Sequence, residues 1–334
     1  MPDAVVKIHK TDSTRSEVIH MDRRRFLQAN CCSATAVLVG DNTLHAVALE
    51  TQCRDRIAIF TDHLDDFGYS YDEVARMIAP LKIAGPDLTV RPGGLVRPER
   101  VADDLPKAAA AFREQGMAIP MLSTNLTTGD DPTARPIFSA MAKLGIAYYK
   151  LGYYHYHDLA KWRAELDSER EKLQSLLKLS RLAGVQAGFH NHAGAGIGGA
   201  LWDAWELLEP IDRASVGFYF DPAHATIEGA KHTWKLNLQR IASRLVMVAI
   251  KDFVWEKTSK GWQTRWCPLG EGMVDWEAFF QQLVRIPFPG PLSIHIEYDP
   301  GGSSRVERID NSLAAAQQDI AFVRSHLDKG IPDK

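Results

Sequence analysis

The stretch GVQAGFHNHAG, residues 184–194, has the pattern of a short buried strand that ends in polar side chains before a glycine-rich loop. Side chains alternate along a strand, so His190 and His192 fall on the same side. The strands of α/β barrels present active-site groups in this way, at the carboxyl end and just before a loop. We therefore expect this strand end to contribute to a functional site.

Strand and helix patterns alternate on both sides of this stretch, through residues 54–328. The other predicted strands are residues 56–62, 87–92, 118–125, 146–153, 215–221, 244–253 and 291–300. A helical pattern follows each strand, and such an alternation is typical of a single-domain (β/α)8 TIM barrel, an α/β fold. A doubly wound open sheet usually has a glycine-rich phosphate loop after its first strand, and residues 61–70 contain none.

Two connections in the second half of the barrel are expected to differ from the others. After the sixth strand, the helical pattern is clear only over residues 233–242. After the seventh strand, residues 255–272 are predicted to form a long loop that contains several tryptophans. This loop could stack on a sugar ring or simply cap the barrel.

The composition is that of an ordinary globular protein, with 45% hydrophobic and 24% charged residues. The net charge is −3, and no basic run lies within the predicted barrel, which disfavours nucleic acid as a partner. The spacing of the cysteines fits neither a zinc knuckle nor a disulfide framework, although a bridge between the last two is open. The cysteines are Cys31, Cys32, Cys53 and Cys267.

Residues 1–48 are expected to be an N-terminal extension with an export signal. Residues 22–28, DRRRFLQ, resemble the twin-arginine motif, and an apolar run and an Ala-Val-Ala cleavage pattern at residues 46–48 follow it. The apolar run is too short for a stable membrane span. We expect a periplasmic or secreted protein that is exported in the folded state, with Met21 as an alternative start. A disordered basic tail is the other interpretation.

The carboxyl ends of the predicted strands carry a set of polar side chains, and in a barrel these ends share one mouth. An ionised carboxylate or ammonium needs a partner or a metal there, so the set indicates a network or a site. Each residue also has a structural explanation, such as a helix cap, a surface ion pair, a satisfied loop histidine or a solvated rim charge. The set is Arg91, Lys150, His190, His192, Asp221, His224, Lys251, His295 and Glu297.

Four segments resemble the xylose isomerase-like barrel superfamily of sugar phosphate isomerases and epimerases, over about residues 54–328. The segments are SVGFYFDPAHATIEG (215–229), RLVMVAIKDF (244–253), PLGEG (268–272) and LSIHIEY (292–298). The most specific features are the Asp-x-x-His step from Asp221 to His224 and the strand-end carboxylate Glu297. The resemblance implies a barrel enzyme that holds one divalent metal, with Mn, Co or Zn as candidates.

The resemblance implies metal ligands at His190, Asp221 and Glu297, but the ligand set is altered in this sequence. His190 stands where relatives often have glutamate, and Ala249 stands where they have histidine. An imidazole can still bind a metal, whereas a methyl group cannot. Lys251, on the same strand face as Ala249, would repel a metal or supply its positive charge.

We expect a sugar isomerase or epimerase that removes a proton next to the carbonyl of a keto-sugar, with or without a metal. The predicted catalytic residues are Glu297, Lys251 and Asp221. The predicted substrate contacts are His224, His192, Arg91, Lys150 and Trp255. A lyase or dehydratase on a keto-sugar is the second hypothesis, and a carbohydrate-binding barrel without catalysis is the third. A metal-dependent nuclease is disfavoured by the acidic balance, and a homo-oligomer is open.

Overall fold

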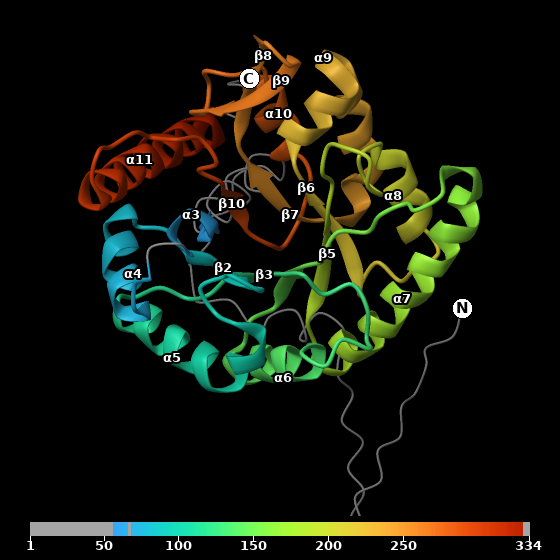
Figure 1. The fold of residues 1–334 in the computed structure, drawn as a ribbon, viewed down its shortest axis with the longest axis horizontal. Helices are drawn as coiled ribbons and strands as arrows, with labels where there is room; N and C mark the ends of the chain where they lie inside the picture. Colours follow the sequence, from blue (N-terminus) through green and yellow to red (C-terminus); the bar gives the residue numbers. More distant parts are fainter. Residues whose placement is uncertain (1–55, 66–67, 330–334) are drawn as a thin grey trace, which may run out of the picture. The chain divides into compact units, whose positions relative to one another are not determined.

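Eight short parallel strands close into a barrel in the computed structural model, which describes residues 56–65 and 68–329 (Figure 1). Each strand pairs with its neighbours in chain order, and the last barrel strand closes the ring by pairing with the first. This arrangement confirms the predicted fold class. The barrel strands are β1 (Ile57–Phe60), β2 (Gly85–Val90), β3 (Met121–Thr124), β4 (Tyr148–Lys150), β5 (Gln186–His190), β6 (Val216–Phe220), β7 (Leu245–Ile250) and β10 (Leu292–Ile294).

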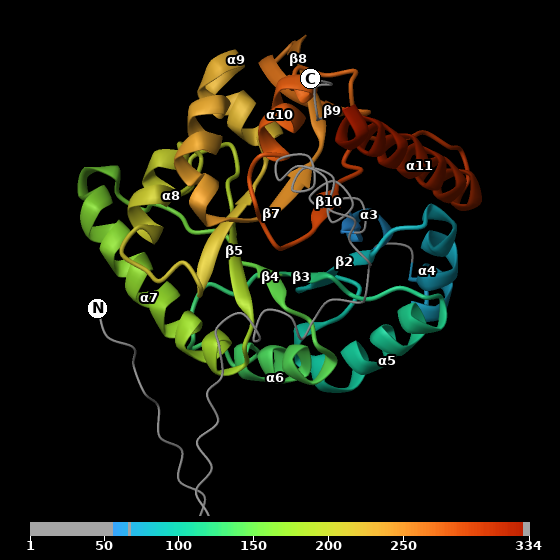
Figure 2. The ribbon, with the colours of Figure 1, turned by 180° about the vertical axis from the view of Figure 1, so that it is seen from behind.

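Helices lie outside the ring of strands, as the two opposite views show (Figures 1 and 2). The α-helices are α3 (Asp62–Asp65), α4 (Tyr71–Ile78), α5 (Val101–Glu114), α6 (Ala134–Leu144), α7 (Trp162–Leu182), α8 (Leu201–Leu208), α9 (Pro222–Ile241), α10 (Trp276–Leu283) and α11 (Arg305–Lys329). Short 3-10 turns occupy Ala79–Leu81, Pro98–Arg100, Leu159–Lys161 and Ala242–Arg244. None of the helices in the described ranges is long and apolar enough to cross a membrane.

The barrel strands are apolar because both of their faces are covered. Every residue of β7 is buried, as expected for a parallel strand between helices and a filled barrel. Met247 of β7 packs with Met121, Tyr219 and Ala249 in a small cluster that is separate from the main core. Gly188 of β5 makes room for this cluster, since a Cβ at that position would clash with Cε of Met247.

Helix α9 begins directly after β6, whereas the sequence pattern placed it at residues 233–242. Asp221 caps the helix by accepting a hydrogen bond from N of His224, and Pro222 occupies the first turn, where its missing N–H costs nothing. Ala230 has non-helical angles (φ 54°, ψ −160°) and interrupts the helix. This break explains why only the later turns showed a clear helical pattern.

The predicted loop at residues 255–272 was wrong, because most of it belongs to an antiparallel hairpin. Strand β8 (Asp252–Thr258) pairs with β9 (Gly261–Cys267) along its whole length. Most side chains of β9 are exposed, so the segment lacks the hydrophobic alternation that reveals a half-buried strand. The hairpin starts two residues after β7 ends and therefore rises from the mouth of the barrel.

Asp252 organises the segment that follows the hairpin, and it does not form the surface ion pair with Lys251 that was one interpretation of the sequence. Its carboxylate is buried and accepts hydrogen bonds from four backbone amides and one indole. The donors are N of Phe253, Gly270, Gly272 and Val274, and Nε1 of Trp276. Residues 268–272 are thus folded around one buried charge.

The predicted export signal at residues 1–48, the alternative start at Met21 and the residue Cys53 lie outside the described residues. Cys267, the other half of the bridge left open by the sequence, is buried at the end of β9.

Candidate active site

Asp221 occupies the centre of the barrel mouth and has two separate tasks. Its Oδ1 caps α9, while Oδ2 faces Nε2 of His190 at 3.3 Å and Nζ of Lys251 at 3.5 Å. Asn191 holds the backbone on either side of this carboxylate, since its side chain accepts from N of Asp221 and donates to O of Asp221. Capping and site chemistry were competing interpretations of the sequence; the structure shows the cap, and it also places the second oxygen among polar groups of the mouth.

Two buried imidazoles flank the same carboxylate. Nε2 of His224 lies 3.8 Å from Oδ2 of Asp221, and neither of its ring nitrogens has a hydrogen-bond partner among the described residues. One ligand atom from each of His190, Asp221 and His224 lies within 4.8 Å of the others. The sequence grouped the first two with Glu297, whereas the structure groups them with His224.

Both histidines are held in the neutral form. Burial lowers the pKa of His190 well below its usual value, and the nearby ammonium groups of Lys251 and Lys150 lower it further. Burial also lowers the pKa of His224 well below its usual value, although the charge of Asp221 opposes the shift. Neutral imidazoles can accept a hydrogen bond or bind a metal through the free nitrogen.

Lys251 is buried between two carboxylates. Its Nζ donates to Oε1 of Glu297 at 2.9 Å and lies 3.5 Å from Oδ2 of Asp221, with only 3% of the side chain exposed. The ammonium also lies 4.4 Å from the ring centre of Trp266. Because Lys251 occupies one oxygen of Glu297, this carboxylate is drawn toward the lysine and away from the pair of histidines.

Glu297 remains ionised at the mouth. Burial alone would raise its pKa, but the charge of Lys251 and the hydrogen bond with His295 hold the pKa well below its usual range. Both contacts use Oε1, and 26% of the side chain is exposed. Of the atoms in the described residues, none forms a hydrogen bond with Oε2, which is left for a ligand.

A row of hydrogen bonds runs from Glu297 into the barrel interior. Nδ1 of His295 lies 3.2 Å from Glu297, and Nε2 lies 2.9 Å from the hydroxyl of Tyr219. Tyr219 donates to Oδ2 of Asp87, which also accepts from Ser293. These contacts connect Glu297 at the mouth with Asp87 in the barrel interior through His295 and Tyr219.

Lys150 and Tyr153 form a second cationic corner of the mouth. Nζ of Lys150 donates to O of Leu151 and lies 4.0 Å from the ring centre of Tyr153. Burial lowers the pKa of Lys150 to about 7, with Arg91 and Lys251 contributing to the shift against the opposing charge of Asp87. The hydroxyl of Tyr153 lies 3.3 Å from Nδ1 of His190, which connects this corner with the Asp221 cluster.

The other predicted substrate contacts, His192, Arg91 and Trp255, lie in three different surroundings. The ring of His192 lies 4.0 Å from that of His224. Arg91 forms an ion pair with Asp62 at the rim, and burial lowers its pKa although Tyr153 and Glu297 oppose the shift. Trp255 is 40% exposed on β8 and packs edge-on against Phe253.

Trp266, rather than Trp255, is the hairpin tryptophan that lies beside the cluster. Its ring centre lies 5.3 Å from that of His224. The two tryptophans lie on the same face of the hairpin but two pairs apart, with Trp266 opposite Phe253 and Trp255 opposite Thr264, so Trp255 lies further from the barrel. Because the sequence analysis predicted no hairpin, it could not tell which of the two tryptophans lies beside the cluster.

Three further side chains of the site were missed by the sequence analysis: Tyr153, Tyr219 and Asp87. Tyr219 lies two residues before Asp221 on the same strand face, which was an available signal. Asp87 lies in the middle of a strand that is buried throughout, where a lone carboxylate indicates a buried polar network. Tyr153 follows β4 and carried no comparable signal.

Residues 87–326 match the family described as xylose isomerase-like TIM barrel. The chain belongs to this family. No curated protein matches the sequence of this xylose isomerase-like barrel.

Solved structures share the fold at low sequence identity. A xylose isomerase-like TIM barrel protein from Mycobacterium smegmatis, in complex with magnesium, is 14% identical with a TM-score of 0.62, covering 83% of this chain and 98% of the other. D-allulose 3-epimerase from Methylomonas sp., in complex with D-allulose, is 15% identical with a TM-score of 0.60 and coverages of 81% and 96%. A probable 3-DHS dehydratase from Bacillus anthracis is 11% identical with a TM-score of 0.58 and coverages of 80% and 98%.

The donor set of this xylose isomerase-like barrel fits a divalent metal. Three ligands from two neutral imidazoles and one carboxylate suffice for a metal that keeps an open position for substrate or water. The unpartnered nitrogens of buried His224 supply an independent sign, since a buried polar atom without a partner is costly. Lys251 opposes this fit, because its ammonium shares Oδ2 of Asp221 with the site.

We expect the stability of the metal-free protein to fall as the pH is lowered from about 7 toward 5. His190 and His224 have depressed pKa values when folded, whereas histidines of the unfolded chain take up protons near pH 6.5. The unfolded state therefore binds more protons below that pH, and each histidine removes up to about 1.4 kcal/mol per pH unit. Urea unfolding in chelator, followed between these pH values, measures the slope.

The variant His224→Gln should show a shallower slope, because it removes one of the histidines with a lowered pKa. The exposed residue His232 lies on the same helix, so His232→Gln is the matched control and should keep the wild-type slope. Equal slopes in His224→Gln and the wild type would contradict a neutral His224 in the folded protein.

Proposed function

We propose that the protein is a sugar isomerase or epimerase that removes a proton from the carbon next to the carbonyl of a keto-sugar. The observation that carries this proposal is the ionised Glu297, whose Oε1 is fixed by Lys251 and His295 while part of the side chain is exposed at the mouth. The similarity in fold to an epimerase solved with its sugar also supports it.

Glu297 is suited to be the general base. It is a carboxylate at neutral pH because Lys251 and His295 lower its pKa against the effect of burial. A base must reach the proton that it removes, and Oε2 is oriented by the two bonds to Oε1 without being occupied itself. Asp221, in contrast, is fully buried and surrounded by partners, which suits a positioning role.

Lys251 is suited to stabilise the negative charge that develops on the carbonyl oxygen. Proton removal next to a carbonyl produces an enediolate, and a fixed positive charge beside it lowers the barrier most where water is excluded. The ammonium is 3% exposed and is held in place by two carboxylates and an aromatic ring. It therefore needs no reorganisation during the reaction.

The other polar groups of the mouth are suited to hold sugar hydroxyls. Neutral His224 and His192 can donate or accept, and Lys150 with a pKa near 7 can return a proton. A divalent metal held by His190, Asp221 and His224 would polarise the carbonyl as a Lewis acid.

A dehydratase is the second candidate, since elimination begins with the same proton removal next to a carbonyl. The shared fold with a probable 3-DHS dehydratase favours keeping it. Products distinguish the two, because elimination releases water and leaves an unsaturated or deoxy-keto sugar, whereas epimerisation conserves the formula.

We expect Glu297→Gln to lower the rate of proton exchange by at least about a hundredfold while leaving the fold intact. The glutamine keeps the shape of the side chain but has no basic oxygen. Exchange is measured by NMR as deuterium uptake next to the carbonyl when a panel of ketoses is incubated in deuterated water. Glu271→Gln, a change at an exposed glutamate, should exchange like the wild type. Full exchange activity in Glu297→Gln would contradict the assignment.

We expect protein purified without chelator or histidine tag to contain about one Mn, Co or Zn per chain, by elemental mass spectrometry. His224→Gln should bind the same metal at least about tenfold more weakly in a calorimetric titration, because it removes a direct ligand. His232→Gln again serves as the control. A metal-free wild type that also fails to bind added metal would contradict the site and leave Lys251 as the source of positive charge.

A further inference from the structure

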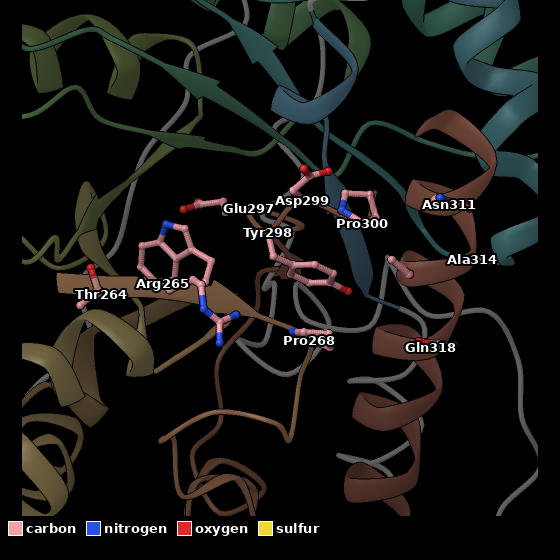
Figure 3. A pocket seen from close by; sticks show the side chains of 12 residues that line it. Thr264, Arg265, Pro268, Glu297, Tyr298, Asp299, Pro300, Asn311, Ala314 and Gln318 are labelled. Atoms are coloured by element: carbon pink, nitrogen blue, oxygen red, sulfur yellow. The ribbon is translucent and has the colours of Figure 1, made fainter. Parts of the chain in front are cut away.

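A second pocket adjoins the barrel mouth, between the hairpin, the segment after β10 and helix α11 (Figure 3). Its volume is about 750 Å³, within the range of small-molecule sites. Glu297 lines one end, and the α11 residues Asn311, Ala314 and Gln318 line the other. The proposed base therefore belongs both to the mouth and to this pocket, so a ligand can occupy both at once.

The wall of the pocket combines aromatic rings with planar polar groups. Trp266 and Tyr298 provide flat apolar surfaces, while the amides of Asn311 and Gln318 offer donors and acceptors, with one N–H of Asn311 already donated to O of Gly301. A sugar ring has one face of C–H groups and an edge of hydroxyls, and it needs both kinds of partner. Nothing comparable would be required by a purely apolar ligand.

Both aromatic rings are held in place before any ligand binds. The hydroxyl of Tyr298 donates to Oδ2 of Asp319 at 3.0 Å, and Oδ1 of Asp319 accepts from N of Leu269. The ring of Trp266 packs against the ammonium of Lys251. A wall that is fixed in advance costs less ordering when a ligand binds.

The charge of the wall argues against a phosphate. Arg265 is the single cation among the described residues that line the pocket, and it already forms an ion pair with Glu256 at 3.0 Å. Asp299 and Glu297 add two carboxylates to the same wall. A neutral, hydroxyl-rich group is therefore favoured over an anion.

We propose that this pocket binds a second sugar ring, so that the substrate is a ketose carried in a disaccharide or glycoside rather than a free monosaccharide. The proposal rests on the proposed function for the ring that reacts at Glu297. The second ring lies between Trp266, Tyr298 and helix α11, and the bond that joins the two rings passes beside Glu297.

The test compares D-fructose with four disaccharides that contain a ketose: maltulose, lactulose, turanose and palatinose. Ala314→Trp fills the pocket from an exposed position on α11 and touches none of the proposed catalytic groups. Ala321→Trp is the matched control, since Ala321 is also exposed on α11 but lies outside this pocket, about 10 Å further along the helix. Calorimetry gives the dissociation constants, and circular dichroism verifies folding.

We expect at least one disaccharide to bind the wild type at least about tenfold more tightly than D-fructose, because its second ring makes additional contacts in the pocket. Ala314→Trp should remove this advantage without changing the affinity for D-fructose, and Ala321→Trp should retain it. The second-ring pocket is overturned if no disaccharide binds more tightly than D-fructose, or if Ala314→Trp keeps the advantage.

Deuterium exchange on the same sugars separates this proposal from the proposed function. Exchange of D-fructose without a disaccharide advantage would overturn only the pocket. A disaccharide that binds in a pocket-dependent way, with no proton exchange on any sugar, would overturn only the enzyme assignment.

Discussion

The buried ammonium of Lys251 is the feature on which the rest of the site depends. It lies 2.9 Å from Glu297 and 3.5 Å from Asp221, so three charges share a space that admits little water. Removing a charge from such a group leaves the others uncompensated, which costs far more than breaking an exposed pair. The lysine therefore fixes the orientation of both carboxylates. Its hydrogen bond also holds the carboxylate of Glu297 on the hairpin side of the mouth, where the second pocket begins.

Ala249 occupies the position where the resemblance implied a metal-binding histidine. A methyl group at that position joins the apolar cluster inside the barrel and leaves the mouth without a donor there. Lys251, two residues later on the same strand face, places a positive charge beside Asp221 and Glu297. The remaining donors, His190, Asp221 and His224, still form a compact set. The mouth thus combines a fixed positive charge, that of Lys251, with a set of donors that fits a divalent metal.

The sequence predicted the eight barrel strands because parallel strands covered on both faces are continuous apolar runs. It also predicted that Asp221, Lys251 and Glu297 would meet, since strand ends share one mouth. It could not predict the β8–β9 hairpin, whose side chains are mostly exposed. Nor could it decide whether Glu297 joins the histidines or the lysine, because strand alternation gives a direction and not a distance. The row from His295 through Tyr219 to Asp87 was missed for a related reason, as it joins three strands across the barrel interior.

The most direct test of this account is a double-mutant cycle on the unfolding free energy with Lys251→Met and Glu297→Gln. We predict that each single change destabilises the protein by roughly 3 kcal/mol, because it takes from a largely buried charge one of its two partners. The double mutant should lose at least about 1 kcal/mol less than the sum of the two, and the exposed pair Arg265–Glu256 should show a coupling below that value. Additive effects of Lys251→Met and Glu297→Gln, within about 0.5 kcal/mol, would contradict the claim that these charges form one unit.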